Sequence, residues 1–74
     1  MSNFTPRQVQ FAKDKGHKWM FVDPSNRVRS NVEQPKIHTV EHYFGPLLEW
    51  QPSGEVIGGY QEDKWWTNTL EKIA

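Results

Sequence analysis

Residues 18–32 read KWMFVDPSNRVRSNV and predict a β-hairpin. The residues before the turn are mostly aromatic or β-branched and favour a strand. The segment DPSN, residues 23–26, is typical of a turn, because aspartate suits its first position and proline already has the φ angle of the second. After the turn the sequence alternates with period two, which predicts that Val28 faces the core while Arg27 and Arg29 point outward.

The motif TPRQ, which begins at Thr5, predicts the start of a helix. Thr5 can accept a hydrogen bond from the backbone N–H of Gln8, and the Gln8 side chain can reach back to the N–H of Thr5, as in a capping box. Proline follows the cap at a position where its missing N–H costs nothing. We expect a helix from Pro6 to about Lys15, ended by Gly16.

Two further strand regions are expected in the middle of the chain. Residues 37–44 are compatible with a strand or a short helix, and their β-branched and aromatic side chains favour the strand. A second hairpin is expected from Leu47 to Tyr60, with its turn at QPSG, residues 51–54, where Gly54 can adopt a positive φ.

The C-terminal segment, residues 61–73, predicts a helix, because Trp66, Leu70 and Ile73 recur at the spacing of one helical face. We therefore expect residues 1–74 to form a single compact α+β domain, a twisted antiparallel sheet of three to five strands packed with an N-terminal and a C-terminal helix. The predicted core consists of Phe4, Val9, Ala12, Met20, Val22, Val28, Leu48, Trp50, Val56, Trp66, Leu70 and Ile73.

The composition excludes several classes of protein. The chain has no cysteine, so disulfides, thiolate metal sites and cysteine nucleophiles are impossible. The N-terminus lacks the apolar stretch of a signal peptide, and no apolar run approaches the roughly 20 residues that span a bilayer. We expect a cytoplasmic protein that does not contact a membrane.

Charge is separated along the chain although the formal net charge is zero. Residues 1–36 carry seven basic and three acidic side chains, a net charge of +4, and residues 37–74 carry two basic and six acidic side chains, a net charge of −4. Separated charge can steer a charged partner onto one face of a protein, whereas a fold that mixes the two halves would cancel this effect.

One motif, HTVEH at residues 38–42, has the order of ligands and base in an inverted zinc-protease motif. On a helix, His38 and His42 would lie one turn apart and could share a metal ion. On a strand they would lie two pleats apart, and a third ligand would have to come from His17, Glu49 or Glu55. Since such enzymes also need a substrate cleft, we expect no catalytic residues, no cofactor and no functional metal site.

The residues expected to bind a partner are Lys18, Trp19, Arg27, Arg29 and Trp65. Arginine beside aromatic side chains is a common composition of interface hot spots, and adjacent tryptophans at 65 and 66 cannot both enter one core if the segment is helical. The alternative is a small nucleic-acid-binding module that uses the basic β-hairpin. A net charge of zero argues against this alternative, because phosphate contacts dominate nucleic-acid affinity.

The whole chain resembles the small regulators that bacteriophages encode early in infection and that bind host RNA polymerase. The resemblance is carried by the opening MSNFTPRQVQF, the absence of cysteine, the four tryptophans and the basic segment WMFVDPSNRVRSNV. It implies a non-catalytic, protein-binding α+β domain that occupies a surface of host RNA polymerase and inhibits or modifies transcription. It implies no particular residue roles.

Overall fold

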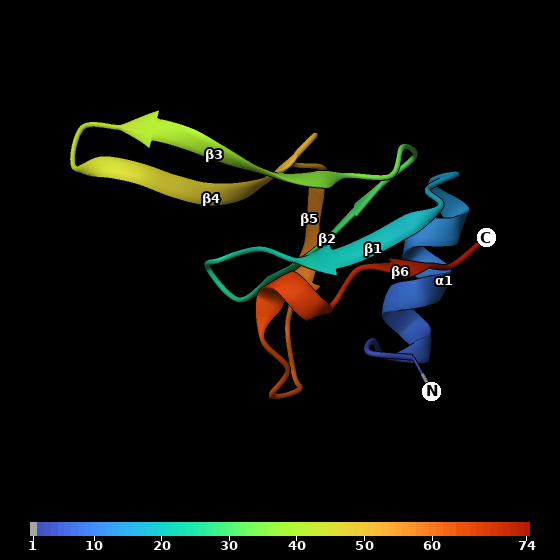
Figure 1. Ribbon diagram of the computed structural model, residues 1–74. Helices are drawn as coiled ribbons and strands as arrows, with labels where there is room; N and C mark the ends of the chain where they lie inside the picture. The colour runs from blue at the N-terminus through green and yellow to red at the C-terminus, as the bar shows by residue number, and fades with distance from the viewer. Residues whose placement is uncertain (1) are drawn as a thin grey trace.

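The computed structural model describes residues 2–74, which form one α-helix, one 3₁₀ turn and six β-strands (Figure 1). In chain order these elements are α1 (Pro6–Asp14), β1 (Trp19–Val22), β2 (Arg27–Asn31), β3 (Lys36–His42), β4 (Gly45–Gln51), β5 (Glu55–Gly59), η1 (Trp66–Asn68) and β6 (Glu71–Lys72). The predicted α+β class is confirmed. Within these residues, no helix is long and apolar enough to cross a membrane.

The strands form two antiparallel sheets, where the sequence predicted one. The larger sheet has the order β5-β2-β1-β6, and β3 pairs with β4 in a separate two-stranded sheet, which confirms the strand expected at residues 37–44. The hairpin expected from Leu47 to Tyr60 is wrong, because β4 pairs with β3 whereas β5 pairs with β2. The segment at residues 51–54 therefore carries the chain from one sheet to the other.

Helix α1 begins as its capping motif predicts. The backbone N–H of Gln8 donates to Thr5 Oγ1 at 3.1 Å, and the backbone N–H of Thr5 donates to Gln8 Oε1 at 3.2 Å. The helix ends at Asp14, one residue before the predicted Lys15, and Gly16 follows with a φ of 79°. Local hydrogen bonds and one glycine are therefore sufficient to define both ends of this helix.

The first hairpin, β1 and β2, forms around the predicted turn. The N–H of Asn26 donates to the carbonyl of Asp23 at 2.9 Å, and Asn26 adopts a φ of 63°, which asparagine tolerates better than most residues. Met20, Val22 and Val28 are fully buried on the face of the sheet that packs against α1. This face is the main core of the molecule.

The opposite face of the same sheet is also covered, which the sequence pattern did not indicate. Phe21 lies on this face and is fully buried, with its ring centroid 5.3 Å from that of Trp50 in β4. Trp50 Nε1–H donates to the carbonyl of Val22 at 2.9 Å. The base of the two-stranded sheet therefore packs over Phe21, whose cross-strand neighbour is Arg29.

The predicted core is confirmed in part. Six of its residues are buried, namely Phe4, Ala12, Met20, Val22, Val28 and Trp50. Val9, Trp66, Leu70 and Ile73 are partly buried, and Leu48 and Val56 are exposed. The prediction omitted two buried aromatic residues, Phe21 and Tyr60. Phe21 was missed because its face of β1 was expected to meet solvent.

The helix predicted over residues 61–73 is wrong, since this segment contains only η1 and the two-residue strand β6. The fully buried Thr69 accepts a hydrogen bond from the N–H of Val22 at 2.8 Å. The Glu71 carboxylate accepts hydrogen bonds from residues 2 and 3 at 2.6 and 2.9 Å. These contacts, distant in sequence, outweigh the helical spacing of the apolar residues, because intrinsic helix propensity is weak.

Candidate binding surface

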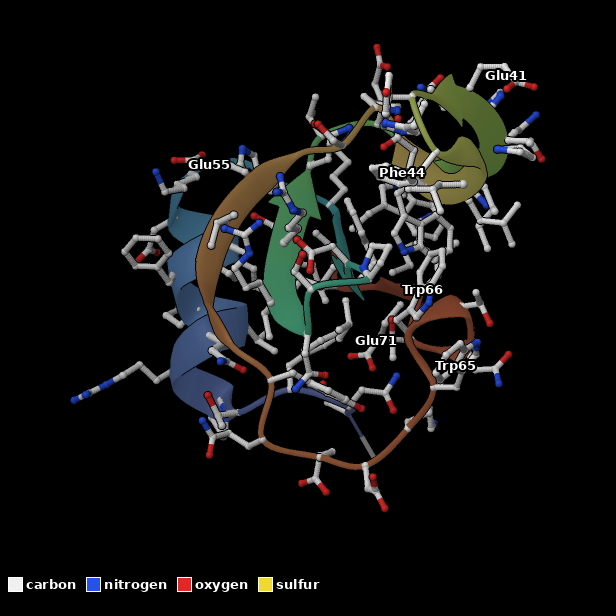
Figure 2. The ribbon with its side chains drawn as sticks, turned by 90° about the vertical axis from the view of Figure 1, so that its left-hand side faces the viewer. Glu41, Phe44, Glu55, Trp65, Trp66 and Glu71 are labelled. Carbon is white, nitrogen blue, oxygen red and sulfur yellow. The ribbon has the colours of Figure 1, made fainter. Side chains whose placement is uncertain are left out.

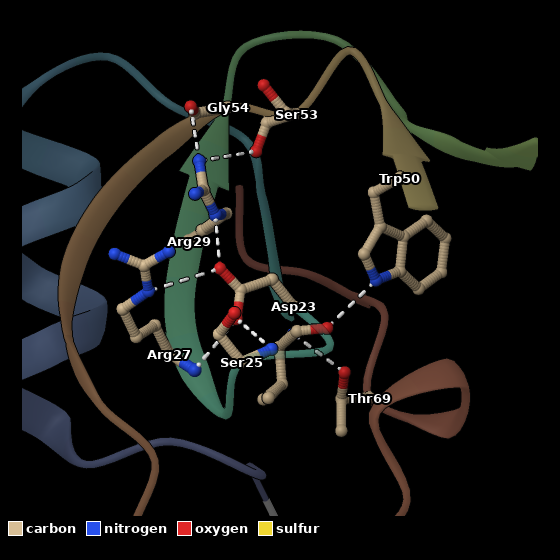
Figure 3. A network of polar contacts seen from close by, with 9 residues as sticks. Asp23, Ser25, Arg27, Arg29, Trp50, Ser53, Gly54 and Thr69 are labelled. Carbon is tan, nitrogen blue, oxygen red and sulfur yellow. Dashed lines mark hydrogen bonds and ion pairs between the residues drawn. The ribbon is translucent and has the colours of Figure 1, made fainter. Parts of the chain in front are cut away.

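Asp23 organises the two arginines of the first hairpin (Figure 3). Its carboxylate accepts a 2.6 Å hydrogen bond from Arg29 Nε, and it accepts bonds from the N–H groups of Ser25 and Arg27 at 2.9 and 3.0 Å. Arg29 also donates to the two carbonyls of residues 53–54, and its side chain is only 19% exposed. The expectation that both arginines point outward is therefore wrong for Arg29.

The ionisation of Asp23 follows from this environment. Burial alone would raise the pKa of the Asp23 carboxyl, but hydrogen bonds from the Arg29 side chain and from the N–H groups of Arg27 and Ser25, with the Arg29 charge, hold that pKa below its ordinary value. Asp23 is therefore a carboxylate at neutral pH, and it neutralises Arg29. This ion pair holds the turn against the segment that links the two sheets.

Arg27 is the arginine that remains accessible. Its side chain is 51% exposed, and its Nε lies 3.5 Å from Asp23 Oδ2. Ion pairs this exposed contribute little free energy and are readily exchanged for contacts with a partner. The prediction of an outward-pointing arginine is confirmed at this position.

Lys18 and Trp19 lie at the other end of the first hairpin from Arg27. The N–H of Lys18 donates to the carbonyl of Asn31, and Trp19 is paired with Asn31 across the ribbon. Five steps along the strand, at about 3.3 Å each, separate Lys18 from Asp23 by roughly 16 Å. Lys18 is exposed but Trp19 is partly buried, so the structure does not bring these two residues together with Arg27 in one basic patch.

Trp65 lies beside the turn of the first hairpin. It is 67% exposed, and it lines a shallow hollow together with Pro24 and Asn26. Figure 2 shows Trp65 on the outer side of the η1 segment, with Trp66 turned towards the body. The Trp66 ring lies edge-on to Trp50 at 6.0 Å. The five residues expected to bind a partner therefore lie in two separate places, one at each end of the hairpin.

The HTVEH motif lies on strand β3, where it cannot act as it would on a helix. His38 and His42 are four residues apart on an extended strand, so their Cα atoms are about 13 Å apart. Two imidazoles at this separation are too far apart to share one metal ion, whose nitrogen ligands lie about 2.0–2.1 Å from it. Within residues 2–74, no group of three or more histidine, cysteine or acidic side chains is placed to hold a metal ion.

Ser30, His17 and Glu55 form an arrangement that superficially matches a hydrolytic triad. Ser30 Oγ lies 2.6 Å from His17 Nδ1, and His17 Nε2 lies 4.0 Å from the Glu55 carboxylate. Ser30 is fully buried, however, so no substrate can reach its hydroxyl. Glu55 instead pairs with Lys15 at 2.9 Å, which holds the pKa of the Glu55 carboxyl below its ordinary value. This cluster connects the end of α1 to β2 and β5.

The β3–β4 hairpin is the most exposed element of the molecule. Figure 1 shows it extending from the four-stranded sheet on the side away from α1. The aromatic residues of its turn, Tyr43 and Phe44, are 104% and 76% exposed. Of the nine large hydrophobic residues exposed within residues 2–74, five lie on this hairpin, namely Ile37, Tyr43, Phe44, Leu47 and Leu48. The largest exposed apolar surface is therefore on an element that sequence reasoning left out of the candidate site.

A groove of about 340 Å³ lies between this hairpin and the first hairpin. One wall contains residues 23–25 of the DPSN turn with Arg27 and Arg29, and the other contains His42 and the β4 residues 47–50. Because four consecutive residues of β4 line it, the groove follows the edge of that strand. The apolar wall of Leu47 and Leu48 thus faces an accessible guanidinium group, that of Arg27.

The hairpin itself carries few charges. Residues 36–51 include one lysine and two glutamates, a formal charge of −1 with neutral histidines. A surface of this kind binds through aromatic and apolar contacts, and it lacks the basic groups that phosphate binding requires. The signal that could have revealed it is the sequence YFGP at residues 43–46, which places two large aromatic residues at a turn where small polar residues are usual.

Comparison with known proteins found no family model that matches this sequence, and no match among curated proteins or solved structures.

Proposed function

We propose that this chain is a non-catalytic, protein-binding regulator that uses the β3–β4 hairpin as its principal contact. The observation that carries the proposal is the exposure of Tyr43 and Phe44 at the tip of a two-stranded sheet that extends from the body. An isolated two-stranded hairpin is at best marginally stable in water, and large exposed apolar patches mark interaction sites. Aromatic side chains bury a large area on binding for a small loss of side-chain freedom.

The nucleic-acid alternative is weakened by the geometry. Arg29 is occupied by Asp23, and Lys18 lies at the far end of the ribbon from Arg27. A phosphate-binding surface needs several accessible cations in one place. The first hairpin offers only one accessible cation at its turn, Arg27, and the β3–β4 hairpin has a formal negative charge.

The partner that the resemblance implies is host RNA polymerase, and we propose it as the specific target. A non-catalytic chain of this size would act by occupying a surface of the larger enzyme, with Tyr43 and Phe44 inserted into an apolar pocket and Arg27 at the rim. Fully desolvated aromatic anchors dominate the energy of such interfaces. Removal of the Tyr43 and Phe44 side chains should therefore abolish binding at concentrations at which the intact chain is bound.

The test is direct binding of the purified chain to purified bacterial RNA polymerase from its host, measured by biolayer interferometry. The variant carries Tyr43→Ala and Phe44→Ala, and the matched control carries Phe11→Ala, because Phe11 is an exposed aromatic residue, 51% exposed, on a different element, α1. We expect the hairpin variant to bind at least about 100-fold more weakly, since hot-spot residues each contribute about 2 kcal/mol or more. Binding by the control should be unchanged.

The possible results separate the two parts of the proposal. If the polymerase does not bind but another purified protein binds in a manner that depends on Tyr43 and Phe44, the hairpin interface is supported and the polymerase assignment is wrong. Equal binding by the hairpin variant and the intact chain would refute the hairpin as the contact surface.

A further inference from the structure

The outer edge of β3 is an unpaired strand edge. Within residues 2–74, β3 pairs only with β4, and no strand covers its other side. The groove beside the body is lined by β4 residues 47–50 and by no β3 residue except His42, so β3 lies on the side of the hairpin that faces away from the body (Figure 1). The outer edge of β3 is therefore accessible along its length.

Pro46 determines which backbone groups face outward. It is paired with Glu41, and because proline has no N–H, this must be a pair without ladder hydrogen bonds. Pairs with and without hydrogen bonds alternate along an antiparallel ribbon. The N–H and carbonyl groups of Ile37, Thr39 and Glu41 therefore point away from β4, at the outer edge of β3. On β4, the corresponding edge has lost one donor at Pro46 and lies against the groove.

We propose that a second copy of this chain pairs with the outer edge of β3, so that two hairpins form one four-stranded antiparallel sheet. A two-fold axis through Thr39 pairs the full seven-residue strand Lys36–His42 with itself. In this register Thr39 faces Thr39 of the second copy, and Ile37 faces Glu41. The three residues with outward-pointing groups thus meet each other, as hydrogen-bonded antiparallel pairs require.

The side chains fit this register. His38 faces Val40 and Lys36 faces His42, so no two acidic side chains and no two lysines are opposed. A central pair of threonines is a favourable cross-strand pair. A register moved by two residues to centre on Glu41 would place two glutamates opposite each other, which is destabilising. The sequence of β3 is therefore self-complementary in the register that uses the whole strand.

Pairing also explains how a long, lone hairpin is stabilised. A sheet needs about three strands or more for independent stability, and β3–β4 has two. The proposal goes beyond the proposed function and does not depend on it, because it rests on the backbone of β3, whereas the proposed function rests on the turn residues Tyr43 and Phe44.

The first experiment measures self-association by sedimentation velocity from about 1 µM to about 1 mM, a range that covers weak dimers. Thr39→Pro removes the outward N–H at the two-fold axis in both copies at once, and should weaken the dimer at least about tenfold. Leu48→Pro is the matched control, because it removes an outward N–H from β4 and should leave the dimer intact. Circular dichroism checks that both variants retain their sheets.

The second experiment tests the register, and it uses the absence of cysteine from the chain. Thr39→Cys places two thiols on directly opposed residues, about 5.5 Å apart at Cα, within the range of a disulfide. Ile37→Cys places them four residues apart along the strand, about 13 Å, beyond that range. Under mild oxidation we expect a covalent dimer from Thr39→Cys and none from Ile37→Cys.

A chain that remains monomeric up to about 1 mM would overturn the proposal, as would a dimer equally sensitive to both proline substitutions. If the intact chain is monomeric but Thr39→Pro abolishes binding to a partner protein, the edge accepts a strand from that partner and the second copy is the wrong occupant.

Discussion

Removal of Arg29 should destabilise the protein strongly, whereas removal of Arg27 should not, although both arginines contact the same carboxylate. Asp23 has a side chain that is 9% exposed, and Arg29 is its closest cationic partner at 2.6 Å. Removing one member of a buried ion pair typically costs about 3–5 kcal/mol. Here the backbone N–H groups of Ser25 and Arg27 still satisfy one oxygen of the carboxylate. We therefore expect Arg29→Ala to lower the free energy of unfolding by about 2–3 kcal/mol.

The matched variant Arg27→Ala should cost less than about 0.5 kcal/mol, because its side chain is 51% exposed and its contact with Asp23 is 3.5 Å long. For a domain of this size, about 1 kcal/mol corresponds to a change in melting temperature of roughly 4–8 °C. Thermal and urea unfolding followed by tryptophan fluorescence can resolve both effects. The total stability expected for 74 residues is about 4–11 kcal/mol, so the Arg29 variant remains measurable.

The difference between the intact chain and Arg29→Ala should depend on pH in a defined direction. The folded pKa of the Asp23 carboxyl lies below its ordinary value, so its contribution to stability is fully present above that value, 3.8, and is lost as pH falls through the lower folded pKa. The difference between the two unfolding curves should therefore begin to shrink as pH falls below about 4. Equal stability of the two variants at pH 7, or a difference that persists unchanged in acid, would show that the Asp23–Arg29 pair does not hold the turn.

Three further substitutions or additions test other parts of the structure. Gly54→Ala should lower the free energy of unfolding by about 2 kcal/mol or more, because Gly54 has a φ of +72° and an added Cβ would lie 2.7 Å from the Ser30 carbonyl. The control is Gly59→Ala, whose added Cβ meets nothing within 4 Å and which should be nearly neutral in the same thermal melts. Thr69→Val removes the hydroxyl that accepts a hydrogen bond from the Val22 amide, so it should lower the free energy of unfolding by about 1–3 kcal/mol and accelerate hydrogen exchange of that amide. Unchanged exchange would contradict this role of Thr69. Zinc at neutral pH should not raise the melting temperature of the intact chain more than that of a chain with His38→Ala and His42→Ala. A zinc-dependent stabilisation of several kcal/mol would contradict the separation of these histidines on β3.

The candidate surface was only partly predictable because exposure depends on what covers each face of a strand. Period-two alternation correctly separated Val28 from Arg29, but it could not show that Trp50 and residues 53–54 would cover the second face. Tyr43 and Phe44 are also ambiguous in sequence, because the same aromatic residues can fill a core or form an interface. The structure excludes the core position for both, because their side chains are exposed at the tip of the hairpin.

The sequence by itself determined those features whose energy comes from neighbouring residues. Thr5 and Gln8 cap α1, Gly16 ends it, and the Asp23 turn joins β1 to β2, because each of these hydrogen bonds closes within a few residues. The tertiary structure decided the rest. The segment after residue 61 is held by contacts with Val22 and with residues 2 and 3, and β4 pairs with β3 instead of β5. The conformation of the C-terminal segment depends on hydrogen bonds between groups some 45–70 residues apart. The arrangement of the two sheets depends on the hydrogen bond from Trp50 to the carbonyl of Val22. Local propensities differ by only about 1 kcal/mol or less per residue, so such long-range hydrogen bonds and buried contacts override them.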